Sequence, residues 1–497
     1  MSRTGQLLKA ARATANTVGQ SLDNPSHAAS LSYVDLVLNE LILRDDPGFY
    51  LDHIARGELL LTEGHRMLSV GADPWIAPAS LRPEMRADMS AEAINTALDQ
   101  LNACLVDVVA RLDEARSDAE KSYLERVCSW EKGFYDHHLE QAGDSRGEDL
   151  VFTEESLRAY LADKFPHWSG LRVSRVEPLA GGFSKKTVLF ETYDEVNGHQ
   201  SMVLRAEQES SVLRFSKVTQ EFHIIQFMRK AGVPVAEPLW LEEHTEHFGV
   251  PLMVSRKAPG TNHGVTMGGM DSISEKLLQS MIATLCAMHS VKPDADDPLV
   301  QRSPLAEWLA YRDIRAATTH FVTSYLQNLI RETKIDMTPQ LLRVLKWLEA
   351  NVPNEAEESA IVHLDLALNN VLIDDDTVSA VLDWESVRLG DPADDIITTY
   401  DAVSSNISLA DFLDRYAAGT GRSISEYRLA YARVAKCALY MVIFLNATRA
   451  IHHDDDADIK LGLLAFRFMA LMASRFNELI ADAERSKQPQ LADHIRD

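Results

Sequence analysis

Two short apolar segments enclose a polar loop between residues 361 and 383, and this stretch constrains the fold more than any other part of the sequence. The loop carries a carboxylate at Asp365 and, five residues later, an amide at Asn370. A second carboxylate, Asp383, ends the apolar segment that follows. Short apolar segments bounded by polar residues are typical of β-strands. We therefore predict a strand, a loop and a second strand that together carry two carboxylates and an amide.

Phosphoryl transfer requires this set of side chains. One carboxylate orients the attacking hydroxyl and accepts its proton, while an amide and a second carboxylate hold Mg²⁺ on the nucleotide phosphates. Oxygen atoms are the ligands that Mg²⁺ prefers in proteins. We predict Asp365 as the base and Asn370 and Asp383 as the metal ligands. A single Asp in a loop is most often a turn residue, so the hypothesis depends on the combination.

His363 lies two residues before the predicted base and is grouped with the catalytic residues of the loop. Its expected role is to hold the loop by hydrogen bonds rather than to transfer a proton. The run of acidic residues between His452 and Asp458 is instead interpreted as a solvated loop between two helices, because adjacent carboxylates usually mark a surface.

The stretch from about residue 170 to 480 resembles the aminoglycoside phosphotransferase and choline kinase-like family, which shares the protein-kinase fold. His363–Asn370 resembles the catalytic loop of that family, and Asp383–Glu385 resembles its metal-binding motif. The run Leu389–Asp395 is similar to the Gly-Asp-Pro continuation of the family. The resemblance implies ATP and Mg²⁺ as cofactors and a small molecule with a hydroxyl group as the acceptor.

The resemblance extends, less sharply, to the region before the loop. It implies a nucleotide loop, a strand with a basic residue that contacts the phosphates, a helix glutamate that pairs with it, and a hinge that holds adenine. The residues at these positions are Gly181, Gly182, Ser184, Arg205, Glu221 and Val254. Arg205 stands where many kinases have Lys, and Leu364 and Asn369 stand where the family often has Gly.

The expected fold is α+β, a two-lobed protein-kinase-like fold preceded by an all-α N-terminal domain. Apolar residues at helical spacing, without any cluster of titratable groups, predict a helical domain of unknown role over residues 1–148. Strand-like segments and one helix predict a nucleotide-binding lobe over 149–255. Mostly helical sequence predicts a second lobe over 256–497, with the catalytic loop and the acceptor pocket.

Charge and composition limit the classes of partner and the compartment expected for this protein. The formal net charge of −25 disfavours nucleic acid and anionic membranes. The apolar stretch from Val434 to Ala447 is interrupted by Lys436 and is shorter than the ~20 residues of a membrane span. Four widely spaced cysteines suggest reduced thiols in a cytoplasmic protein. Association of copies through the N-terminal helical domain is left open.

The leading hypothesis is an ATP-dependent kinase of a small hydroxylated molecule. Aminoglycosides, choline-like amino alcohols, sugars and amino-acid derivatives all remain open as acceptors. The alternative is a catalytically weak nucleotide-binding regulatory or scaffold protein with a kinase-like fold. A protein kinase is disfavoured, because the sequence lacks a full Gly-x-Gly-x-x-Gly loop, an Asp-Phe-Gly motif and an Ala-Pro-Glu motif.

Overall fold

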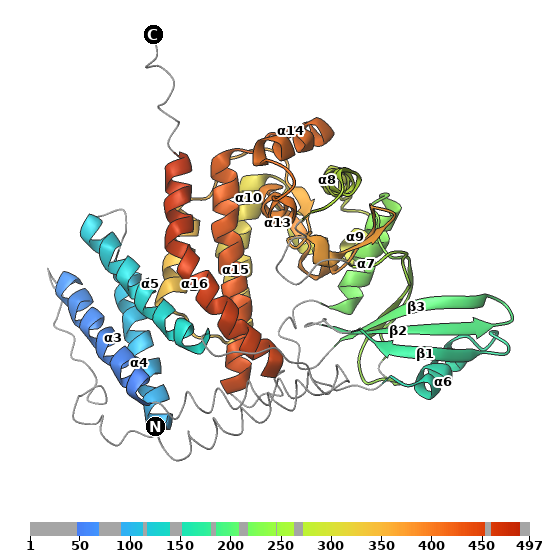
Figure 1. Ribbon diagram of the computed structural model, residues 1–497, viewed down its shortest axis with the longest axis horizontal. Helices are drawn as coiled ribbons and strands as arrows, with labels where there is room; N and C mark the ends of the chain where they lie inside the picture. The colour runs from blue at the N-terminus through green and yellow to red at the C-terminus, as the bar shows by residue number, and fades with distance from the viewer. Residues whose placement is uncertain are drawn as a thin grey trace, which may run out of the picture. The chain divides into compact units, whose positions relative to one another are not determined.

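A computed structural model describes residues 47–68, 91–112, 117–139, 152–179, 185–207, 217–244, 246–262, 272–452 and 459–487 (Figure 1). Contacts divide the chain into two compact units. The first combines residues 1–148 with Leu326–Asn351 and Val434–Arg485. The second combines Asp149–Tyr325 with Val352–Arg433 and Ser486–Asp497.

The second unit contains a five-stranded sheet in which every neighbouring pair is antiparallel. The strand order is β1-β2-β3-β5-β4. The strands are β1 (Arg172–Pro178), β2 (Lys185–Asp194), β3 (Gly198–Glu207), β4 (Pro238–Glu242) and β5 (Leu252–Arg256). Each overlaps a strand-like segment of the sequence, at 171–176, 187–192, 202–206, 237–241 or 251–256, so this part of the prediction is confirmed.

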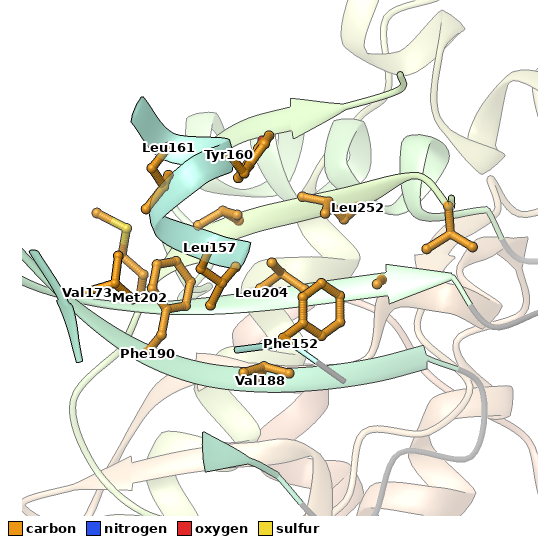
Figure 2. Packing of buried hydrophobic residues seen from close by; sticks show 13 residues of the cluster. Phe152, Leu157, Tyr160, Leu161, Val173, Val188, Phe190, Met202, Leu204 and Leu252 are labelled. Carbon is orange, nitrogen blue, oxygen red and sulfur yellow. The ribbon is translucent and has the colours of Figure 1, made fainter. Parts of the chain in front are cut away.

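The two faces of this sheet are covered differently. Alternate residues of β2, β3 and β5 pack beneath helix α6 (Glu154–Lys164), among them Val188, Leu204 and Leu252 (Figure 2). Residues at the intervening positions point to the opposite face. Helix α7 (Val218–Lys230) contacts β3, β4 and β5 and supplies Glu221 to Arg205 of that face. The sheet therefore has one apolar core face and one face with charged residues.

Short strands, helices and turns make up the rest of the second unit. Two small antiparallel pairs, β6 with β9 and β7 with β8, surround the predicted catalytic loop. The strands are β6 (Ala360–Val362), β7 (Val371–Asp374), β8 (Thr377–Val381) and β9 (Arg388–Gly390). The helices are α8 (Glu275–Ser290), α9 (Pro298–Gln301), η3 (Pro304–Trp308), α10 (Ile314–His320), η4 (Phe321–Tyr325), η5 (Leu368–Asn370), η6 (Trp384–Ser386), α13 (Ala393–Val403) and α14 (Leu409–Thr420). The sequence favours one helix over 302–325, but the structure divides this stretch into η3, α10 and η4.

Helix α15 (Glu426–His452) begins in the second unit and continues in the first. Within the described part of the chain, its segment Glu426–Ala447 is long and apolar enough to cross a membrane, judged by length and composition alone. More than half of the most apolar window of that segment is buried inside the protein, as in the core helix of a soluble domain. One such helix is weak support for a membrane span.

The first unit is a helical assembly built from distant parts of the chain. Its other described helices are α3 (Pro47–Leu68), α4 (Ala91–Arg111), α5 (Asp118–Leu139), α11 (Leu326–Thr333), α12 (Pro339–Ala350) and α16 (Ile459–Lys487). The sequence predicts one helix that begins near Ser90 and another over about 117–138, and helices α4 and α5 confirm both. The sequence does not predict helix α3, because Pro47 and Gly48 indicate the end of a helix around Tyr33; Pro47 instead lies in the first turn of α3, where proline is well tolerated. The helix predicted near Tyr33 lies outside the described residues.

Helix α12 joins the N-terminal helices through packing and hydrogen bonds. It contacts α4 and α5, and Leu342 packs against their apolar core. Glu131 accepts a hydrogen bond from the backbone N–H of Gln340 at 2.9 Å. The Lys346 ammonium donates to the Leu112 carbonyl at 2.7 Å, just beyond the end of α4, where a positive charge is favoured by the helix dipole. The contacts thus divide the chain differently from the predicted ranges, since α12 groups with residues 1–148.

We expect Gly57→Ala to destabilise the first unit. A Cβ at residue 57 would lie 2.5 Å from Leu101 Cδ2 and 2.8 Å from a ring carbon of Trp130. Overpacking costs about 1–3 kcal/mol, which exceeds the gain of about 1 kcal/mol in helix propensity. A lower thermal unfolding midpoint should result. Leu59→Ala on the same helix is the control, because Leu59 is 72% exposed; an unchanged Gly57→Ala midpoint would contradict the packing.

We also expect removal of residues 1–148 to impair folding, because it uncovers the apolar face of α12. The helix would lose the core formed with α4 and α5 and the carboxylate of Glu131. Soluble yield and size-exclusion chromatography measure the outcome. The full chain is the control. A truncated protein that stays monodisperse and melts as the full chain does would show that these contacts contribute little.

Candidate active site

The predicted catalytic loop lies between β6 and β7 and is held by His363. The His363 ring is fully buried. Its Nε2 lies 2.8 Å from the Leu382 carbonyl oxygen, and its Nδ1 lies 3.3 Å from the backbone nitrogen of Asp365. This pattern fits a neutral ring with its proton on Nε2. These contacts support the expected role of His363 in holding the loop.

Asp395 in α13 fixes the same loop from the other side. Its carboxylate accepts the backbone N–H of His363 at 2.8 Å and that of Leu364 at 2.5 Å. It also lies 3.1 Å from Nε2 of His289, whose Nδ1 lies 2.9 Å from the Tyr416 hydroxyl. Burial opposes ionisation of Asp395, yet the hydrogen bonds from the histidines hold its pKa below the ordinary value. A buried carboxylate thus anchors the start of the loop.

Leu364 adopts a left-handed backbone conformation, with φ of 71°. This conformation explains why glycine is common at the position in the resembling family, since glycine adopts it without steric cost. A leucine there costs roughly 1–2 kcal/mol. The two hydrogen bonds at Asp395 and the buried His363 ring hold the loop in place. The loop therefore keeps its backbone conformation although Leu364 stands where the family often has Gly.

Asp365 and Asn370 lie side by side. The Asn370 Nδ2 group donates to the Asp365 carboxylate at 2.6 Å and to its backbone carbonyl at 2.9 Å. This arrangement turns the amide nitrogen toward Asp365. The amide oxygen is then the atom that could coordinate a cation. The predicted base and one predicted metal ligand are thus brought into direct contact.

Arg205 connects the sheet to the second predicted metal ligand. Its Nη1 lies 2.5 Å from Glu221 Oε1, and its Nη2 lies 2.9 Å from Asp383 Oδ1. The predicted ion pair between Arg205 and Glu221 is therefore confirmed. Burial opposes the charge of Arg205, but the carboxylates of Glu221 and Asp383 raise its pKa further. A guanidinium can bind two carboxylates at once in this way, whereas an ammonium lacks the planar fork.

The structure describes only one of the remaining predicted site residues, Val254. Gly181, Gly182 and Ser184 lie outside the described residues. Val254 is paired with Leu204 and is buried beneath α6, on the face opposite to Arg205. Its side chain therefore points away from Arg205 and the carboxylates that Arg205 binds.

Two further charged residues lie beside this group. Lys185, the first residue of β2, is 2% exposed, and its Nζ lies 3.8 Å from Glu385 Oε2. Burial and the nearby charge of Asp383 raise the pKa of Glu385 to about 8. Sequence reasoning did not select Lys185. Its position directly after the predicted nucleotide loop, on a strand that pairs with the strand of Arg205, was the available signal.

The Gly-Asp-Pro continuation has a structural role. Asp391 accepts two hydrogen bonds from the Arg428 guanidinium, both at 2.8 Å, and both side chains are buried. Arg388 pairs with Asp394 at 2.7 Å, and its guanidinium lies 4.2 Å from the centre of the Phe321 ring. Burial raises the pKa of Asp394 to about 6. These contacts tie the segment after β9 to neighbouring helices.

The donor atoms fit a magnesium ion that takes few ligands from the protein. Among the described residues, no group of three or more His, Cys, Asp or Glu side chains could hold a metal by itself. Asn370 supplies an amide oxygen and Asp383 a carboxylate that is 34% exposed. Mg²⁺ commonly binds one or two carboxylates and takes its other ligands from water and substrate phosphates. A site with these two donors therefore suits Mg²⁺ only together with a phosphate ligand.

Comparison with known proteins places this chain among phosphotransferases. Residues 175–435 match the model of the phosphotransferase enzyme family. The chain is 27% identical to mouse acyl-CoA dehydrogenase family member 10 over 202 residues, which are 40% of this chain and 18% of that protein. It is 24% identical to hygromycin-B 4-O-kinase of Escherichia coli over 240 residues, 48% of this chain and 64% of that protein. The chain thus spans less than two thirds of the length of these relatives.

Among solved structures, a Ralstonia eutropha protein assigned to the aminoglycoside phosphotransferases is 21% identical, with a TM-score of 0.49. The comparison covers 68% of this chain and all of that one. The family match covers more than half of the chain and includes the loop, the Arg205 cluster and the Gly-Asp-Pro segment. The predicted resemblance and the predicted α+β kinase-like fold are confirmed. The chain belongs to the phosphotransferase enzyme family.

Proposed function

We propose that this protein transfers the γ-phosphoryl group of ATP to a hydroxyl group of a small molecule. The observation that carries the proposal is the pair of contacts that assembles the site. Asn370 binds the Asp365 carboxylate, and Arg205 binds both Glu221 and Asp383. The candidate base and the candidate ligands are thus held by direct hydrogen bonds.

Asp365 is the proposed base. Its carboxylate would accept a hydrogen bond from the acceptor hydroxyl and orient the oxygen for attack, taking the proton late in the reaction. Positioning of this kind supplies much of the rate, because phosphoryl transfer leaves the protein little covalent work. The Asn370 amide keeps the carboxylate in place. Buried His363 keeps the backbone of the loop in place.

Asn370 and Asp383 are the proposed ligands of Mg²⁺, which would neutralise charge on the nucleotide phosphates when bound. The charges around them support a requirement for metal. The described cluster holds two basic side chains, Lys185 and Arg205, and three carboxylates, Glu221, Asp383 and Glu385. Such a cluster offers no net positive charge to a triphosphate. A divalent cation would compensate for this.

The acceptor is proposed at the level of a small molecule with a hydroxyl group. The described cysteines, Cys104, Cys128, Cys286 and Cys437, form no disulfide, which supports a reducing compartment such as the cytoplasm.

A screen of small alcohols and amino alcohols for ADP release that depends on the acceptor tests the proposed phosphoryl transfer. ATP binding without any transfer across a broad screen would favour a nucleotide-binding regulatory protein.

We expect Asp365→Asn to lower kcat by about 10²–10⁴-fold, the usual contribution of a general base. The affinity for Mg·ATP should change little, because Asp365 is not a proposed metal ligand. Steady-state kinetics and calorimetry measure the two quantities. Asp376→Asn is a matched control, since Asp376 is exposed on the neighbouring β7–β8 turn. Normal phosphoryl transfer by Asp365→Asn would refute its role as the base.

We expect Asp383→Asn to weaken both catalysis and nucleotide binding. The substitution removes a negative ligand, so the affinity for Mg·ATP should fall on the order of tenfold or more. Calorimetric titration of ATP with and without Mg²⁺ separates the metal effect from the nucleotide effect. If Asp383→Asn and Asp365→Asn weaken Mg·ATP binding equally, the proposed division of roles is incorrect.

A further inference from the structure

We propose that Lys185 is a second phosphate-binding residue of the nucleotide site, held beside Glu385 when no nucleotide is bound. The inference depends on the proposed function, because it takes the ligand to be a nucleoside triphosphate. It adds a basic residue that lies outside the predicted nucleotide-binding set. The support comes from the register of the sheet, the burial of Lys185 and its contact with Glu385.

The register of β2 and β3 directs Lys185 toward the charged face of the sheet. Thr187 lies opposite Arg205, and Lys185 lies opposite Glu207. Residues directly opposite each other in an antiparallel pair share a face, and residues two apart on one strand also do. Lys185 and Arg205 are therefore diagonal neighbours on one face, roughly 7–8 Å apart at the backbone. Two cations at this spacing can contact different phosphates of one triphosphate.

The contact of Lys185 with Glu385 is loose for a buried ion pair. The ammonium lies 3.8 Å from Glu385 Oε2, beyond the range of a hydrogen bond. Glu385 Oε2 is buried and accepts no hydrogen bond from the described residues. A buried ion pair repays its desolvation only when its geometry and hydrogen bonds are good. A phosphate oxygen would offer the Lys185 ammonium a short, charge-assisted hydrogen bond instead.

The position of the pair also favours a nucleotide ligand. Glu385 lies two residues after Asp383, which Arg205 binds at 2.9 Å. The two basic residues thus contact the same turn, one through Asp383 and the other through Glu385. Phosphates bound with Mg²⁺ at Asp383 would lie beside both cations.

The experiment must separate phosphate binding from simple neutralisation of Glu385. Lys185→Met alone leaves the Glu385 carboxylate buried without its nearby lysine, so its effect would be ambiguous. We therefore compare Lys185→Met/Glu385→Gln with Glu385→Gln alone. Calorimetry measures ATP and AMP binding, first in EDTA, where no metal contributes, and then with Mg²⁺. Thermal unfolding without nucleotide measures the structural effect.

We expect the double variant to bind ATP at least about tenfold more weakly than Glu385→Gln. AMP binding should be equal in the two proteins, because the β- and γ-phosphates are missing. Lys186→Met in the Glu385→Gln background is the matched control. It removes the same charge from the α6 face of the sheet and should leave ATP binding unchanged.

Each outcome decides the question. Equal ATP affinity in the double variant and in Glu385→Gln would overturn the inference and leave Lys185 a structural partner of Glu385. Equal losses from the Lys185 and Lys186 changes would also overturn it, as a general effect of charge. If the Met variant fails to fold, Lys185→Gln in the same background must show the loss of ATP affinity. A wild-type protein that binds no ATP under either condition would refute the proposed function itself.

Discussion

The assembly of the candidate site depends on one side chain, the guanidinium of Arg205. It reaches from β3 to Glu221 of α7 and to Asp383 at the end of the short hairpin. The sheet, the helix and the Asp383 segment come from three separate parts of the sequence, and this contact fixes them to each other. A lysine would offer a compact ammonium at a single point, without the planar fork by which the guanidinium spans the two carboxylates. Arg205, which stands where many kinases have Lys, therefore contacts Glu221 and Asp383 with a geometry that a lysine could not reproduce.

A second buried charge does the same for the catalytic loop. Asp395 holds the backbone at His363 and Leu364, and His289 and Tyr416 extend the hydrogen bonds into the surrounding helices. Such fully bonded polar groups specify one arrangement of a core, because any shift would leave a buried polar atom unpaired. The loop can carry a leucine with positive φ for this reason. The backbone of the candidate catalytic loop is thus held by residues other than the proposed base and metal ligands.

Elements that depend on local sequence patterns could be predicted, whereas contacts between residues far apart in the chain could not. The five strands followed from strand-like segments of the sequence, and the Arg205–Glu221 pair followed from the resemblance and the order of its motifs. The pairing of Asp391 with Arg428 did not, because no local pattern marks a partner 37 positions away. Lys185 was missed because a lysine at a strand end is usually exposed. The grouping of α12 with the N-terminal helices likewise depends on contacts across the chain.

The composition of the first unit has a consequence for protein synthesis. Helix α5 ends at Leu139, and its partner α12 begins about 200 residues later, at Pro339. A ribosome adds roughly 5–20 residues per second. The apolar faces of α3, α4 and α5 are therefore without their partner α12 for about 10–40 s of synthesis. Helix α16 follows later still. The N-terminal helices are thus synthesised first, but their unit is complete only after α12 and α16 have been made. A nascent chain of this protein therefore exposes part of this apolar core for most of its synthesis.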